Sequence, residues 1–404
     1  MVRVSRAWLI GVLTVVLAAG GLLNAADWPN WLGPDHNQIS PEKGFKTTWT
    51  EKPKVLWEKP LGAAFSSFSI VGDKLYTCGA KAGQQVLFCL NPASGDVIWE
   101  VPFEKQYKDG QGGDGTRATP TVDDGRVYIL GGYGLLLCVD AADGKKELWR
   151  KQFNAKPQWG YSASVLIEGD MAVVTAGGSD GGLAAFNKKT GKPIWRSSDD
   201  LVGYATPYPF TFSSKRYIAG FLGKGAIIVE AKTGREVWRT PWKTNYDINA
   251  SAPVFHDGHL FLTSAYGTGC ALFKLTPEGD DLKGEEVWRS KVIVNKFQQC
   301  ILWDGALYCG DDQTLKCVEF LTGNELWKVP RMANATVILA DKQLIVFSEG
   351  GKLLIAPVSP KEFKPTANAQ VLEKRCWTIP LLHDGKLYCR NLEKAVCVDI
   401  AAAK

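Results

Sequence analysis

The stretch from Asp304 to Trp327 reads DGALYCGDDQTLKCVEFLTGNELW, and its pattern decides the fold. Asp304-Gly305 is a dipeptide that favours the tight positive-φ turn between two antiparallel strands. The aliphatic-aromatic pair Leu307-Tyr308 follows it at the start of a strand. Thr322-Gly323 then marks a second, bulged turn, and Trp327 begins an outer strand. The stretch therefore predicts short antiparallel strands that are joined by tight turns.

The same pattern recurs through the whole chain. Turns with a following aliphatic-aromatic pair occur at 72–76, 124–128, 257–261 and 384–388, and degenerate copies lie between them. A fixed period of 20 to 50 residues is typical of repeat architectures. Here this slot of the repeat recurs about every 45 residues, with degenerate copies in the middle of the chain and at Leu344: Leu75, Val127, Met171, Arg216, Leu260, Leu307, Leu344 and Leu387.

A tryptophan follows the second turn of most repeats. Four short strands per repeat are the unit of a propeller blade, so the chain is predicted to be all-β, an eight-bladed β-propeller of four-stranded antiparallel blades. The last repeat ends near Ile400 without an outer strand, whereas Val55-Leu56-Trp57 is an outer strand without a repeat before it. We expect the strand around Trp57 to close the ring, which removes two exposed sheet edges. The repeat tryptophans are Trp57, Trp99, Trp149, Trp195, Trp238, Trp288 and Trp327.

The repeat consensus, Leu-x-Cys/Ala-x-Asp-x-x-Thr-Gly-Lys-x-x-Trp, resembles a known family. It is similar to the pyrroloquinoline-quinone-like repeat of quinoprotein dehydrogenases and of BamB-like propellers in outer-membrane barrel assembly. The opening Asp27-Trp28-Pro29-Asn30-Trp31-Leu32-Gly33-Pro34 resembles the leader of secreted propellers of the planctomycete type, with Leu32 in place of the usual Arg. The resemblance covers nearly all of the mature chain. It implies the fold but leaves the function open, because the repeat is a structural motif.

The N-terminus has the three parts of a secretory signal peptide. Arg3 and Arg6 precede an apolar run, which ends at Ala25-Ala26. We expect a signal peptide over 1–26, a leader segment over 27–53, and the propeller over 54–404. The product would be exported to the periplasm or the extracellular space, and it would stay at a membrane only if the signal were left uncleaved.

The charge of the chain argues against nucleic acid as a partner. The formal net charge is +5, and removal of Arg3 and Arg6 with the signal leaves +3. No basic run is longer than two lysines. This charge is too small for the electrostatic footprint of a nucleic-acid-binding protein.

Ten cysteines in an exported chain raise the question of disulfides. Four of them share one repeat position, where other blades hold Ala or Ile, which predicts small buried side chains. Two further cysteines lie eight residues before a member of that set, and a three-residue turn would place each pair directly opposite across a hairpin. Both reduced core thiols and cross-strand disulfides stay open. The paired candidates are Cys309 with Cys317 and Cys389 with Cys397.

No catalytic or metal constellation stands out in the sequence. His256 and His259 flank one turn, but the repeat positions no third ligand beside them. The chain has no Gly-x-Ser-x-Gly elbow, no adjacent cysteines and no Cys-x-x-Cys-His motif. We therefore predict no catalytic residue and no metal ligand.

The mouth of the central funnel is the candidate binding surface. Residues at the start of the inner strands combine aromatic rings with hydrogen-bonding groups, which suits a planar, anionic or sugar-like ligand. The alternative is that they only plug a water-filled channel. The glycine-rich insert from Tyr107 to Gly115 is either a lid or a simple loop. The candidate residues are Arg117, Trp159, Tyr161, Tyr204, Asn249, Gln298, Asn334 and Trp377.

The sequence thus favours a non-catalytic binding or scaffolding propeller of the cell envelope, with no cofactor. Its partner would be a protein, a carbohydrate or another small molecule. One alternative is a quinone-dependent alcohol or sugar dehydrogenase with pyrroloquinoline quinone (PQQ) and calcium. In that case Trp159 or Trp377 would form the quinone floor, and Asp247 with Asn249 would ligate calcium. The other alternative is a BamB-like module that docks partners in outer-membrane protein assembly.

Overall fold

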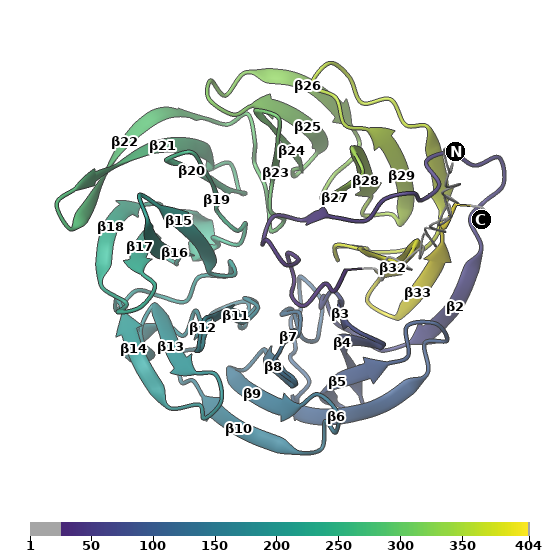
Figure 1. Cartoon of the computed structure of the whole chain (residues 1–404), viewed down its shortest axis with the longest axis horizontal. Coiled ribbons are helices and arrows are strands. Elements are labelled where there is room, and N and C mark those ends of the chain that lie inside the picture. The colour runs from purple at the N-terminus through teal and green to yellow at the C-terminus, as the bar shows by residue number, and fades with distance from the viewer. Residues whose placement is uncertain (1–25, 403–404) are drawn as a thin grey trace, which may run out of the picture.

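The computed structural model describes residues 26–402, and they form a ring of eight four-stranded blades. Figure 1 shows the blades around a central opening. The eight-bladed all-β prediction is confirmed. The expected signal peptide falls almost entirely on residues 1–25, which lie outside the described residues.

Each of the first four blades uses four consecutive strands from the centre outward. Blade 1 holds β3 (Ser69–Val71), β4 (Lys74–Lys81), β5 (Gln84–Leu90) and β6 (Val97–Lys105). Blade 2 holds β7 (Thr121–Asp123), β8 (Arg126–Leu130), β9 (Leu135–Asp140) and β10 (Glu147–Gln152). Blade 3 holds β11 (Leu166–Glu168), β12 (Met171–Val174), β13 (Leu183–Asn187) and β14 (Pro193–Ser197). Blade 4 holds β15 (Tyr208–Phe212), β16 (Lys215–Phe221), β17 (Gly225–Glu230) and β18 (Glu236–Pro241).

The remaining blades follow the same plan until the ring closes. Blade 5 holds β19 (Val254–His256), β20 (His259–Ser264), β21 (Gly269–Glu278) and β22 (Asp281–Ser290). Blade 6 holds β23 (Ile301–Trp303), β24 (Ala306–Gly310), β25 (Thr314–Glu319) and β26 (Glu325–Pro330). Blade 7 holds β27 (Thr336–Ala340), β28 (Gln343–Phe347), β29 (Lys352–Pro357) and β30 (Ala367–Gln370). Blade 8 holds β31 (Leu381–His383), β32 (Lys386–Arg390), β33 (Lys394–Asp399) and the N-terminal β2 (Val55–Pro60). Short 3-10 turns lie at Gly178–Asp180 (η1) and Asn245–Asp247 (η2).

A rung of three side chains explains the repeat consensus. In blade 6, Tyr308 on β24 pairs with Cys317 on β25, which in turn pairs with Trp327 on β26. The Tyr308 and Trp327 ring centroids lie 6.0 Å apart. Directly opposed residues share one face of a sheet, so the small cysteine leaves room for both rings. The four cysteines at this repeat position are buried, as predicted.

Six of the repeat tryptophans join their blade to the next one. The Trp149 indole nitrogen of blade 2 donates to the Lys188 carbonyl of blade 3 at 3.0 Å, and five other repeat tryptophans make the equivalent bond. The turn glycine of the next blade lies directly under the ring. A β-carbon added at Gly191 would lie 2.7 Å from the Trp149 ring, at a backbone φ of 68°. The turn glycine is therefore required by the packing between blades as well as by its turn.

The N-terminal strand closes the ring, as predicted. β2 pairs antiparallel with β33, with Trp57 opposite Cys397. The Trp57 indole nitrogen donates to the Pro92 carbonyl of blade 1 at 2.9 Å. The seam between blades 8 and 1 is therefore built like the other blade junctions.

The leader segment crosses the central channel. Trp28 pairs with Ile70 of blade 1, and the Val122 amide of blade 2 donates to the Pro29 carbonyl. A two-residue strand, β1 (Ile39–Ser40), then adds to β27 of blade 7 in a parallel pairing that the repeat pattern did not predict. Figure 1 shows this purple segment running across the opening of the ring. The leader therefore blocks one end of the channel.

The register corrects the expected cysteine pairs. Cys309 lies opposite Lys316, and Cys317 lies opposite Tyr308, so the two cysteines are offset by one residue. Cys389 and Cys397 are offset in the same way. Successive side chains on a strand point to opposite faces, which separates the members of each pair. The physical cause is a four-residue turn, because Gly310 pairs with Leu315, where a three-residue turn was expected.

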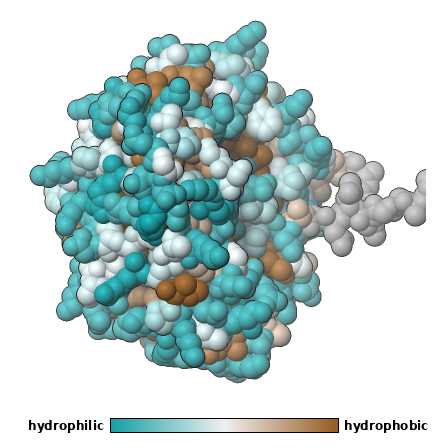
Figure 2. All heavy atoms as spheres, turned by 60° about the vertical axis from the view of Figure 1, so that its left-hand side comes forward, coloured by the Kyte–Doolittle hydropathy of each residue, from teal (hydrophilic) through white to brown (hydrophobic). Residues whose placement is uncertain are grey.

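The outer surface is mostly hydrophilic in the view of Figure 2, where hydrophobic side chains form only small separate patches. Within residues 26–402, no helix has both the length and the apolar character needed to cross a membrane.

Candidate functional site

A blind cavity of about 410 Å³ opens at the centre of the ring. Its volume lies in the range of small-molecule sites, about 300–1,000 Å³. Most of its wall comes from loops that lead into the inner strands, where eight aromatic side chains converge from different blades. The aromatic residues are Trp31, Phe65, Trp159, Tyr204, Tyr246, Tyr266, Phe297 and Trp377.

The leader contributes Trp31 to this cavity. Trp28 fixes the turn beside it, because a β-carbon on Gly33 would lie 2.7 Å from the Trp28 ring and Gly33 has a φ of 81°. Leu32, which stands in place of the family's usual Arg, is buried in the core. The leader motif therefore closes the channel with apolar side chains and leaves one indole in the cavity wall.

Trp377 is held rigidly in the wall. Its indole nitrogen donates to Glu349 Oε1 at 2.8 Å. Its ring stacks on Phe65 at a centroid distance of 5.6 Å and an interplanar angle of 24°, and it contacts Phe297 at 5.0 Å. A ring that is fixed on its edge and on its faces presents a preorganised surface to a ligand.

Lys296 brings a positive charge to the cavity. Its Nζ lies 4.9 Å from the Trp377 ring centroid and 5.8 Å from that of Tyr266. Within residues 26–402, Lys296 has no carboxylate within the 4.0 Å of an ion pair. Asp312 is the nearby acid, and its pKa is raised chiefly by burial, although Lys296 lowers it. The ammonium is therefore held by aromatic faces and not by a direct counter-ion.

Two buried polar atoms of the wall lack partners among the described residues. Gln298 is 2% exposed, and its Nε2 donates to the Asn334 carbonyl at 3.0 Å, but its Oε1 accepts no hydrogen bond. The Trp159 indole nitrogen also has no acceptor. An unsatisfied buried polar group costs about 1–3 kcal/mol, so each such group in a folded protein needs an explanation. Both atoms are closed to solvent, so they lie behind the cavity surface and are not open to a ligand in the cavity.

The cavity rim holds two strained tyrosines. Tyr246 is 61% exposed with a φ of 67°, and Tyr266 is 38% exposed with a φ of 58°. Their rings meet edge to face at 6.4 Å. Bulky residues rarely adopt a left-handed backbone, and such strain collects at ligand clamps. The rim thus presents two exposed aromatic rings, each on a residue with a strained backbone.

The glycine-rich insert is pinned to the cavity wall. Arg117 forms a buried ion pair with Asp109 at 2.5 Å and donates to the Gly113 carbonyl at 3.1 Å. From the other side of the seam, Arg375 donates to the Gly112 carbonyl. The guanidinium of Arg117 is therefore neutralised by Asp109, so it orders the insert and adds little free positive charge.

The structure separates the eight predicted mouth residues into two groups. Arg117, Trp159, Tyr204, Gln298 and Trp377 line the cavity, and their role in binding stays a prediction. The other three have structural contacts instead. Tyr161 is buried in the core and donates to the Ala176 carbonyl at 2.9 Å, Asn249 donates to the Leu222 carbonyl at 2.7 Å, and Asn334 donates to Glu349 at 3.1 Å.

Sequence reasoning missed other wall residues, among them Trp31, Tyr246, Tyr266 and Lys296. Trp31 lies outside the repeats, and the two tyrosines and the lysine lie in loops that vary between blades.

The proposed calcium ligands do not fit the geometry. The Asn249 Nδ2 donates to the Leu222 carbonyl, and the Asn249 Oδ1 accepts a hydrogen bond from Ser264 Oγ at 2.8 Å. Among residues 26–402, no three His, Cys, Asp or Glu side chains are gathered as a metal site. A planar carboxylate such as PQQ suits the aromatic wall and Lys296, but the Asn249 side chain is already bonded within the core and is not free to ligate calcium.

His36 in the leader gives a pH-dependent prediction. Burial lowers its pKa to about 4, with a further contribution from Arg216 of blade 4. Because the unfolded chain binds a proton at His36 near pH 6.5 and the folded chain does not, stability should fall as the pH drops from 6.5 to 4. The loss assigned to His36 is at most about 3 kcal/mol.

Urea unfolding at pH 7.0 and pH 4.5 tests this prediction. In a His36→Gln variant, the loss of unfolding free energy on acidification should be smaller than in the parent. The matched control is His256→Gln, which changes an exposed histidine and should show the same loss as the parent. Equal losses in parent and His36→Gln would contradict the assignment.

The repeat rungs, the eight blades and the blind aromatic cavity define a propeller of the PQQ-like repeat class. A family model described as "Outer membrane protein assembly factor BamB" matches residues 82–329 and 223–362, and the chain belongs to this family. The resemblance seen in the repeat consensus is thereby confirmed.

Individual relatives point in two directions. The chain is 24% identical over 331 residues to "Outer membrane protein assembly factor BamB" of Burkholderia pseudomallei, which covers 70% of this chain and 81% of the relative. It is 32% identical over 151 residues to "Quinohemoprotein alcohol dehydrogenase ADH IIB" of Pseudomonas putida, but this match spans only 21% of that enzyme.

Solved structures give the same two neighbours. BamB from Moraxella catarrhalis superposes with a TM-score of 0.63 at 15% identity, over 86% of this chain and 99% of that one. Quinohemoprotein alcohol dehydrogenase from Comamonas testosteroni superposes with a TM-score of 0.66 at 12% identity, over 94% and 81%. At such identities the likeness supports the fold alone.

Proposed function

We propose that this protein is a non-catalytic binding propeller of the cell envelope, whose central cavity holds a planar organic anion. The observation that carries the proposal is the Lys296 ammonium, which has no carboxylate within ion-pair distance among residues 26–402 and lies in a cavity walled by aromatic rings. Export to the envelope is part of the proposal and is supported by the sequence of the expected signal peptide and by the relatives.

The charge of the cavity favours an anion over a neutral sugar. Lys296 offers an ammonium without a paired carboxylate, while the charge of Arg117 is neutralised by Asp109. Other aromatic rings of the wall, such as Trp31, would pack on a flat ring system, and Lys296 would bind its carboxylate. A neutral sugar would use the same rings but would leave the ammonium unpaired.

Binding measurements with defined probes test the proposal. The probes are PQQ, a monocyclic aromatic carboxylate, its neutral amide, and glucose. Titration calorimetry and quenching of tryptophan fluorescence measure their binding. We expect saturable binding of a carboxylate probe. The proposal is overturned if no carboxylate probe binds with a Kd below 1 mM, which corresponds to a binding free energy of about −4 kcal/mol.

Variants of the cavity wall sharpen this test. Lys296→Gln should weaken carboxylate binding by about tenfold or more, since a hydrogen bond to a charged group contributes about 1.5–3 kcal/mol, and should leave the neutral amide unaffected. The matched control is Lys364→Gln, which changes an exposed lysine outside the cavity. If Lys364→Gln and Lys296→Gln weaken carboxylate binding equally, the anion responds to the net charge of the protein and not to Lys296 itself.

A second candidate function is the docking of protein partners, as in the assembly role named for the BamB relatives. The match to the Burkholderia protein runs over 81% of its length, which favours this role over that of a dehydrogenase. The dehydrogenase alternative has a direct test, which is dye-linked oxidation of alcohols and aldoses after incubation with PQQ and calcium. Turnover that vanishes in Asp247→Asn would replace the binding proposal with the enzyme.

A further inference from the structure

Two cysteines in blade 6 face each other across the inner hairpin. Ile301 on β23 pairs with Tyr308 on β24, so the next antiparallel position places Cys300 opposite Cys309. Opposed residues in antiparallel strands have Cα atoms about 4.5 or 5.5 Å apart, depending on the hydrogen-bonding position. Both separations fall inside the range of about 4.4–6.8 Å that a disulfide requires.

The two cysteines also share one face of the blade. Cys300, Leu307 and Cys309 belong to the same buried core cluster, between blades 5 and 6. Ile301 and Tyr308, one position along, belong to the core on the other side, between blades 6 and 7. This alternation is what a regular pleat requires, so the sulfur atoms are directed to the same space.

The thiols are sealed from solvent. Cys300 is 2% exposed and Cys309 is 1% exposed. The neighbouring Cys300 thiol, together with burial, raises the pKa of Cys309 well above its usual value. Because the thiolate is the reacting form, the folded dithiol would be almost inert. A bond between these sulfurs must therefore form before the blade closes, while the chain is folding.

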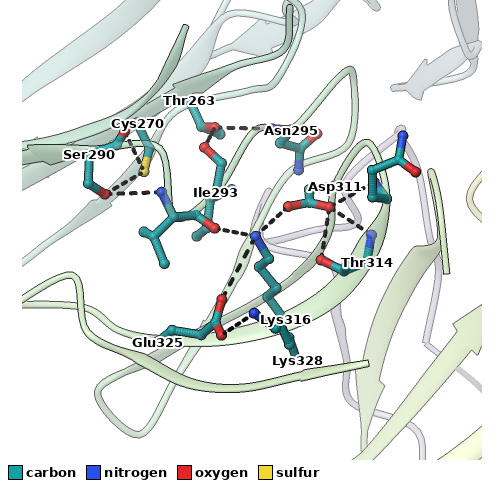
Figure 3. Close-up of polar contacts among 12 residues, drawn as sticks. Thr263, Cys270, Ser290, Ile293, Asn295, Asp311, Thr314, Lys316, Glu325 and Lys328 are labelled. Atoms are coloured by element: carbon teal, nitrogen blue, oxygen red, sulfur yellow. Dashed lines mark hydrogen bonds and ion pairs between the residues drawn. The ribbon is translucent and has the colours of Figure 1, made fainter. Parts of the chain in front are cut away.

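Other groups lie beside this pair, and the Cys300 sulfur accepts a hydrogen bond from Asn295 Nδ2 at 3.8 Å. Figure 3 shows Lys316, which faces Cys309 from β25, turned to the Val292 carbonyl at 2.6 Å and to Asp311 at 2.9 Å. Cys270 lies in the same core cluster, but its sulfur contacts the Ser290 carbonyl at 3.7 Å, as the same view shows. Cys317 lies on the opposite face, against Tyr308. Cys300 is therefore the thiol that the sheet register assigns to Cys309.

We propose that Cys300 and Cys309 form a cross-strand disulfide in this protein. In the reaction, the two thiols lose two protons and two electrons, and one sulfur-sulfur bond forms. A disulfide oxidant, such as an oxidoreductase of the exporting compartment or oxidised glutathione, accepts the electrons and protons and becomes two thiols. In the cell the bond rests on the proposed export, because disulfides persist in oxidising compartments.

Peptide mapping tests the pair without any variant. The protein is refolded in a glutathione redox buffer, denatured, and alkylated without reductant, then digested with trypsin. The tryptic peptide 297–316 holds both cysteines and no other. We expect it to be unalkylated and lighter than its reduced form by two hydrogen atoms. Because the buffer supplies the oxidant, this outcome does not depend on where the protein resides.

Two variants and a thermal measurement complete the experiment. In Cys300→Ser, peptide 297–316 should be alkylated at Cys309, whereas Cys317→Ser should leave the bond intact. Reduction should lower the melting temperature of the parent by about 3 °C more than that of Cys300→Ser, from the entropy of a loop of this size. Alkylation of both cysteines in the refolded parent, or a bond from Cys309 to Cys270, would overturn the proposal.

Discussion

A chain that lacks residues 27–60 is expected to aggregate instead of folding as a monomer. The deletion removes β2, which is the outer strand of blade 8. It exposes the edge of β33 and removes the Trp57 bond to blade 1. An open ring presents unpaired backbone groups and apolar blade faces to other chains. Size-exclusion chromatography and a thermal melt provide the measurement.

The matched control removes only residues 27–53. This shorter deletion also loses the leader, with Trp28 and Phe45 of the core, but it keeps the β2 strand. We expect a less stable protein that is still monomeric, because the ring stays closed. A 27–60 deletion that stays monomeric with the melting temperature of the control would show that β2 does not close the ring.

The fold could be predicted from the sequence because most blades repeat the same turn and strand signals. Asp304-Gly305 and Thr322-Gly323 fix two turns by local backbone preference, and Trp327 fixes the outer strand. Local signals that agree with the global fold are the ones that sequence reasoning reads well. The orphan strand at Trp57 then settled the closure, because one blade lacked the strand that the N-terminus could supply.

The predicted cysteine pairing was wrong by one residue in the register of the hairpin. Whether Cys309 meets Cys317 or Cys300 depends on the length of one turn, and a slip of one position moves a side chain to the other face. The consensus did not reveal that Gly310 and Leu315 pair across a four-residue turn. It also carried no signal for β1, since a two-residue parallel strand depends on contacts between residues about 300 positions apart.

The candidate site was predicted only in part for a similar reason. Sequence position located the start of each inner strand, and this placed Trp159, Gln298 and Trp377 in the wall. It did not tell which side chains turn into the blade, so Asn249 was grouped with them although its amide bonds within the core. Trp31 reaches the cavity from outside the repeats, through tertiary packing that no repeat pattern encodes.

Arg390 is the buried charge at the seam between blades 8 and 1. It lies on β32, is 0% exposed, and has no carboxylate partner within residues 26–402. Its guanidinium donates to the carbonyls of Cys78 and Gly62 and, at 3.2 Å, to Thr77 Oγ1, all in blade 1 or its approach. Burial lowers its pKa to about 10, so it remains charged at neutral pH.

Replacement of this side chain should open the seam. Arg390→Met leaves several buried acceptors without donors, and we expect the unfolding free energy to fall by about 3–5 kcal/mol in urea denaturation. Amide exchange in β2, β3 and β32 should accelerate first, because these strands flank the junction. The control is Arg150→Met, which removes an exposed pair with Glu147 and should cost less than about 1 kcal/mol. If both variants unfold at the same urea concentration, Arg390 does not hold the ring closed, and the closure must rest on β2 and Trp57 alone.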